Sequence, residues 1–66
     1  MSDTEYTPIE GVVMHLTAKA VLLKTLEGYE VWIPLSVIHE DDLDTMEVSD
    51  FAEIAVADWF VAKEGL

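Results

Sequence analysis

The residues of this chain best suited to chemistry are carboxylates gathered in one short stretch. Residues 40–50 read EDDLDTMEVSD and hold no cation among their six acidic residues, which are Glu40, Asp41, Asp42, Asp44, Glu47 and Asp50. Asp42 and Asp44 have the spacing of the first two EF-hand ligands, but Met46 occupies the next ligand position and the sixth position is not glycine. The stretch is therefore interpreted as a solvated linker-like loop or as a row of charge that mimics nucleic-acid phosphate, and neither a metal nor another cofactor is predicted.

Ser36 and the two histidines are the other candidates for a reaction centre. His15 is expected within a strand and His39 at the end of a strand or turn, with no local pairing that would join them around zinc. Ser36 and His39 could form a nucleophile and a base, yet no strained elbow or oxyanion-hole glycines accompany Ser36. The protein is therefore predicted not to be an enzyme.

The overall charge narrows the classes of partner. Among the 66 residues, 14 are acidic and three are basic, all of them lysine, which gives a net charge of −11. Nucleic-acid backbones are bound through Lys and Arg, and anionic membranes attract the same residues, so neither is an expected partner. The charge is explained either as a means of keeping the chain soluble or as the complement of a protein with a basic surface.

Length and hydropathy indicate one small, soluble domain. The chain has no cysteine, its N-terminus is acidic, and its apolar runs are far shorter than a membrane span. We therefore expect a cytoplasmic protein with a flexible tail over residues 1–8 and a single domain over residues 9–66.

The residue pattern predicts mainly β structure. Strands are expected from Ile9 onwards and over residues 18–25, 29–33 and 51–57, with a hairpin turn at residues 26–28 that contains Gly28. A short helical turn that brings Leu35 and Ile38 into the core is expected over residues 34–38, with an edge strand as the alternative. A helix is expected over residues 59–64 that Asp58 caps and Gly65 ends. Connected antiparallel strands of this length favour a small SH3-like or OB-like barrel with a short C-terminal helix, and a flatter sheet is the alternative.

Trp32 is predicted to be partly exposed. It alternates with Val31 and Ile33, so it faces away from the core if they face inward. Both faces of residues 18–25 are apolar, and this strand is expected to be covered on both sides. An exposed Trp32 beside Leu22 would suit contact with another protein or a homodimer.

The central hairpin resembles a recurring set of small, mostly uncharacterised bacteriophage and prophage proteins. The resemblance covers residues 18–66 and rests on Lys19–Leu23, Gly28, Glu30–Pro34, Ser36, Ile38, Val56, Trp59 and the final Gly65-Leu66. Their shared pattern is an apolar strand, a glycine turn and then V-W-I-P-x-S-x-I. The resemblance implies a phage-encoded accessory protein that acts in the host cytoplasm, and it carries no catalytic residues.

These observations lead to one principal hypothesis and two alternatives. The chain is predicted to be a non-enzymatic module or inhibitor whose acidic residues and Trp32 bind a basic protein, such as a nucleic-acid-handling enzyme, with nucleic-acid mimicry as one way of binding. The first alternative is a β-barrel that self-associates near Trp32, with charge serving solubility only. The second is a small metal-binding protein or enzyme.

Overall fold

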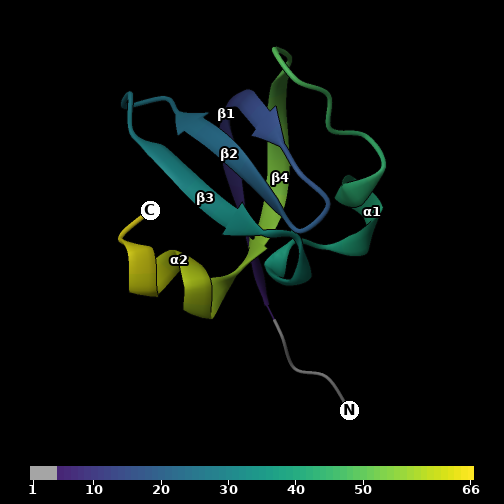
Figure 1. The fold of residues 1–66 in the computed structure, drawn as a ribbon. Helices are drawn as coiled ribbons and strands as arrows, with labels where there is room; N and C mark the ends of the chain where they lie inside the picture. Colours follow the sequence, from purple (N-terminus) through teal and green to yellow (C-terminus); the bar gives the residue numbers. More distant parts are fainter. Residues whose placement is uncertain (1–4) are drawn as a thin grey trace.

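The computed structural model describes residues 5–66 as one antiparallel four-stranded sheet with three short helical segments (Figure 1). Along the sheet the strands lie in the order β3-β2-β1-β4. The elements in chain order are β1 (Tyr6–Leu16), β2 (Ala20–Thr25), β3 (Glu30–Pro34), the 3-10 helix η1 (Leu35–Val37), α1 (Glu40–Leu43), β4 (Phe51–Ala57) and α2 (Asp58–Glu64). The mainly β class, the four strands and the short C-terminal helix are confirmed.

Two tight turns connect the first three strands. Between β1 and β2, the Thr17 hydroxyl accepts the N–H of Ala20 at 3.0 Å and so holds the turn closed. Between β2 and β3, Gly28 has a φ of 94°, a conformation that glycine adopts without steric cost. The predicted glycine turn is therefore confirmed.

The first strand begins earlier than the sequence pattern predicts. Tyr6, Thr7 and Pro8 were expected in a flexible tail over residues 1–8, yet they pair with Ala57, Val56 and Ala55 of β4. The polar composition of this stretch gives no sign of a strand, because its pairing partner β4 lies some fifty residues away in sequence. Of the rest of the predicted tail, Glu5 accepts the N–H of Asp58 through its carbonyl at 2.8 Å, and residues 1–4 lie outside the described residues.

The sheet curls without closing into a barrel. Beyond η1, Ile38 forms an isolated antiparallel bridge with Val56, so the chain after β3 returns to the free edge of β4. The bridge lies beyond β3, so the edge strands β3 and β4 do not pair with each other. The backbones of β1 and β2 approach each other closely at Gly11, which supports the curvature. A Cβ on Gly11 would lie 2.3 Å from the carbonyl oxygen of Lys24.

The core lies on the concave side of the sheet, where each strand contributes alternate residues. Fully buried side chains from all four strands form its centre, namely Val13, Val21, Leu23, Ile33, Ile54 and Val56. Val37, Ile38, Met46 and Phe60 enclose it from the helical segments and loops. The predicted inward turn after β3 is confirmed by the burial of Ile38.

Helix α2 differs from the prediction at its start and agrees with it at its end. Asp58 is the first helical residue and Ala57 occupies the N-cap position, because the Asp58 carboxylate instead accepts a hydrogen bond from the Thr7 hydroxyl. Phe60 is 6% exposed and Trp59 is 58% exposed, so Phe60, with the partly buried Val61, attaches the helix to the core. Gly65 has the left-handed conformation expected of the residue that ends the helix.

Candidate protein-binding surface

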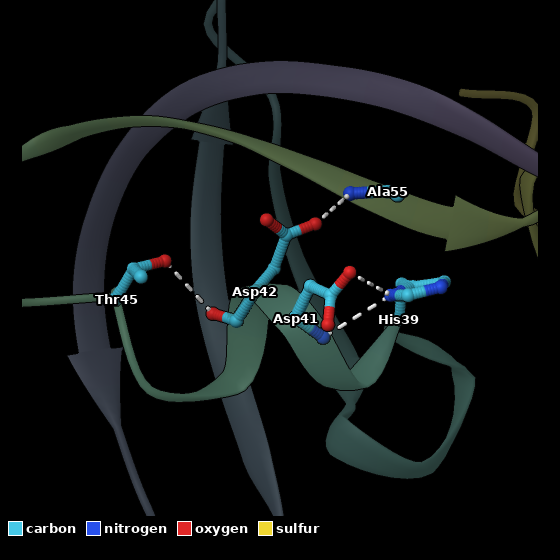
Figure 2. Close-up of polar contacts among 5 residues, drawn as sticks. All are labelled: His39, Asp41, Asp42, Thr45 and Ala55. Carbon is cyan, nitrogen blue, oxygen red and sulfur yellow. Dashed lines mark hydrogen bonds and ion pairs between the residues drawn. The ribbon is translucent and has the colours of Figure 1, made fainter.

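The acidic stretch of residues 40–50, here called the acidic segment, begins with the one-turn helix α1, and the predicted exposed loop covers only residues 44–50, in which Met46 is buried. His39 occupies the N-cap of α1, and its Nδ1 accepts the backbone N–H of Asp41 at 3.1 Å (Figure 2). Glu40, Asp41 and Asp42 fill the first turn, where the positive end of the helix favours carboxylates. These local contacts order the first part of the segment in spite of its charge.

Asp42 attaches α1 to the sheet. Its Oδ2 accepts the N–H of Ala55 at 2.8 Å, and Figure 2 shows its side chain directed from α1 towards β4. The carbonyl oxygen of Ala55 accepts the N–H of His39 at 2.9 Å. The outward-facing polar groups of one residue on the β4 edge are thus both satisfied, one by Asp42 of the acidic segment and the other by His39 directly before it.

The other end of the segment is joined to β1. The N–H of Ser49 donates to the carbonyl of Val13 at 2.7 Å, and the N–H of Val13 donates to the carbonyl of Asp50 at 3.0 Å. Met46 is buried in the core between these two attachments. The segment is therefore held at its start, middle and end, and its exposed side chains have defined positions.

Five of the six predicted carboxylates face solvent on this ordered segment. They are Glu40, Asp41, Asp44, Glu47 and Asp50. Within residues 5–66, one ion pair is formed, in which Asp41 Oδ2 lies 3.6 Å from His39 Nδ1. It requires a proton on the same nitrogen that accepts the Asp41 N–H, so the cap and the ion pair exclude each other. Asp42 is the exception among the six because its carboxylate accepts a hydrogen bond from the Ala55 N–H.

Trp32 lies away from the acidic segment. It belongs to β3, one edge of the sheet, and the segment covers part of β4, the opposite edge. The predicted exposure of Trp32 is confirmed at 49%, and its ring stacks on that of His15 with centroids 6.4 Å apart. The structure therefore does not bring Trp32 together with the predicted carboxylates.

Trp32 belongs to an apolar patch on the outer face of the sheet. Strand register places His15, Leu22 and Trp32 in one row and Phe51, Val12 and Lys24 in the next. Leu22 is only half-buried, so the expected covering of β2 on both sides is wrong: within the described chain no element lies over its outer face. The alternating pattern of β4 already indicated where Phe51 would point, but its neighbours depended on the register.

The remaining candidates for chemistry are dispersed. His15 contacts Trp32 on the outer face, whereas His39 packs edge-on against Tyr6 with centroids 4.9 Å apart. Ser36 lies exposed in η1, and the Nδ1 of His39 is occupied by Asp41. In the part of the chain that the structure describes, no group of three His, Asp or Glu side chains is arranged to hold a metal ion.

No helix within residues 5–66 has both the length and the apolar character needed to cross a membrane. Comparison with protein-family models, with curated proteins and with solved structures gave no match for this chain.

Proposed function

We propose that this protein is a non-enzymatic, phage-encoded accessory module or inhibitor that binds a basic protein through its acidic segment in the host-cell cytoplasm. The observation that carries the proposal is the attachment of the segment to β4 and β1, through Asp42 and Ser49. A flexible acidic segment would keep the chain soluble equally well. Ordering the segment costs conformational entropy, and a binding surface with fixed side-chain positions would explain that cost. A nucleic-acid-handling protein offers the complementary basic groove, in which exposed carboxylates replace phosphates.

The charge distribution supports a partner that is a protein. The described cations, Lys19, Lys24 and Lys63, lie in the β1–β2 turn, on β2 and on α2, outside the acidic segment. The segment therefore repels nucleic acid and other acidic molecules while attracting a basic surface.

The test is capture from bacterial lysate with a matched pair of charge variants. The triple variant Asp41→Asn, Asp44→Asn and Glu47→Gln removes three exposed charges from the segment and leaves Asp42 in place. The control Asp3→Asn, Glu5→Gln and Asp58→Asn makes the same change in net charge elsewhere. We expect the segment variant to lose the captured basic protein and the control to keep it, with wild-type capture at about 50 mM NaCl and little at about 500 mM.

Competition with DNA is a second test of the same proposal. A captured nucleic-acid-binding protein should release a labelled DNA duplex when the wild-type chain is added, and retain it when the segment variant is added. Capture that is unchanged at high salt, or lost equally in both triple variants, would contradict binding by the segment.

The second candidate function is self-association through the outer apolar patch. It is favoured by the exposure of Trp32 and Phe51 on one sheet face. Sedimentation distinguishes it from the first: a dimer that survives high salt and dissociates on Trp32→Glu would establish this role, with charge serving solubility. A monomer throughout the concentration range would exclude it.

A further inference from the structure

A groove opens on the side of the molecule where α2 ends. It has a volume of about 620 Å³, within the range of ligand-binding clefts. It is lined by the start of β1, the β2–β3 turn and the end of α2, together with Glu53 of β4. None of these residues belongs to the acidic segment, so this is a separate surface.

One side of the groove is apolar, and it lies where α2 ends and no longer covers the core. Ile9, Val31 and Leu66 line it, and all three pack partly against the core cluster. Tyr29 and Leu26 of the turn also line it and are largely exposed. The left-handed Gly65 redirects the chain after α2, and the N–H of Leu66 donates to the Val61 carbonyl at 3.0 Å, which fixes this wall.

The other lining residues are acidic. Five glutamates line the groove, and they are Glu10, Glu27, Glu30, Glu53 and Glu64. No basic residue lines the groove within residues 5–66. None of the five glutamates takes part in an ion pair in that part of the chain. An apolar floor edged by unpaired carboxylates matches a side chain with an aliphatic stem and a cationic head.

We propose that this groove binds a Lys or Arg side chain carried by a basic peptide segment with apolar flanking residues. The aliphatic stem lies against Ile9, Val31 and Leu66, and the cationic head meets the glutamates. The exposed ring of Tyr29 supplies a face for the cation. The flanking apolar residues contact Leu26, so recognition needs both charge and hydrophobic area. The proposal shares only the charge of its partner with the acidic segment and does not depend on that segment.

The experiment is an NMR titration of the isotope-labelled full chain with a capped peptide of alternating Leu and Arg. We expect the largest shifts at residues 26–31 and 64–66, and weak or no binding by a peptide with Gly in place of Leu. Replacing Glu27, Glu30 and Glu64 by Gln should weaken binding about eightfold, because three exposed pairs of about twofold each multiply. Replacing Asp3, Glu5 and Asp58 by their amides, the matched control outside the acidic segment and the described groove lining, should change it less than twofold.

Tyr29→Ser provides a test that leaves net charge unchanged, and it should weaken binding about threefold. The proposal is overturned if the wild-type chain does not bind the Leu–Arg peptide, if the Gly–Arg peptide binds as well, or if both charge variants lose affinity equally. Shifts confined to residues 40–50 would also overturn it while leaving the acidic segment as the binding surface. Conversely, peptide binding in the groove together with failure of the lysate capture would reject the proposed function and keep this inference.

Discussion

The carboxylate of Asp42 accepts the backbone N–H of Ala55 at 2.8 Å and thereby joins α1 to the exposed edge of β4. An acidic residue in a strongly acidic stretch thus acts as a hydrogen-bond partner for the sheet. The same contact covers a strand edge that another chain could otherwise extend.

Removing this hydrogen bond should destabilise the fold. Asp42→Ala leaves the half-buried Ala55 N–H without its acceptor, and we expect a loss of about 1–2 kcal/mol in the free energy of unfolding. Asp42→Asn keeps an oxygen that can accept, so it should lose less. Urea denaturation followed by Trp fluorescence measures both. Asp41→Ala is the control, because the 84% exposed Asp41 side chain has no such role, and an equal loss there would show that charge alone is responsible.

Gly11 and Gly28 should respond to alanine for different reasons. At Gly11 the added Cβ would meet the Lys24 carbonyl at 2.3 Å and Leu23 Cγ at 3.1 Å, so the β1–β2 pairing must shift. We expect Gly11→Ala to cost about 2–4 kcal/mol. At Gly28 no atom lies within 4 Å, and only the positive φ opposes alanine, at a cost of about 1–2 kcal/mol. Thermal unfolding would contradict this account if the two costs were reversed.

Neighbouring residues on β3 should differ strongly in their effect on stability. Ile33 is fully buried, so Ile33→Ala removes core contacts and should cost about 2–5 kcal/mol. Trp32→Ser removes a half-exposed ring from the opposite face and should cost less than about 1 kcal/mol, despite the larger change in volume. Chemical denaturation of the two variants checks the assignment of faces, and a larger loss at Trp32 would refute it.

The attachment of α2 should depend on Phe60 far more than on Trp59. Phe60→Ala empties a buried site and should cost about 3–5 kcal/mol, with faster amide hydrogen exchange across Asp58–Glu64. Trp59→Ala removes an exposed ring whose contact with Phe60 is edge-on at 5.8 Å, and we expect a loss below about 1.5 kcal/mol. Equal exchange rates in the two variants would mean that both aromatic residues hold the helix.

Local residue patterns were enough to predict much of the secondary structure. The turn at Gly28 and the left-handed Gly65 both follow from the preferences of single residues. The exposure of Trp32 followed in the same way, because its face is set by its neighbours in sequence.

Contacts between distant residues decided the rest. The early start of β1 depends on pairing with β4, and Asp58 is not the N-cap because its carboxylate bonds to Thr7. The acidic segment is ordered because Asp42 meets Ala55 and Ser49 meets Val13, and strand order alone separates Trp32 from that segment. Charge and composition describe what a segment prefers in isolation, whereas the free groups of a strand edge and the register of a sheet exist only after the chain has folded.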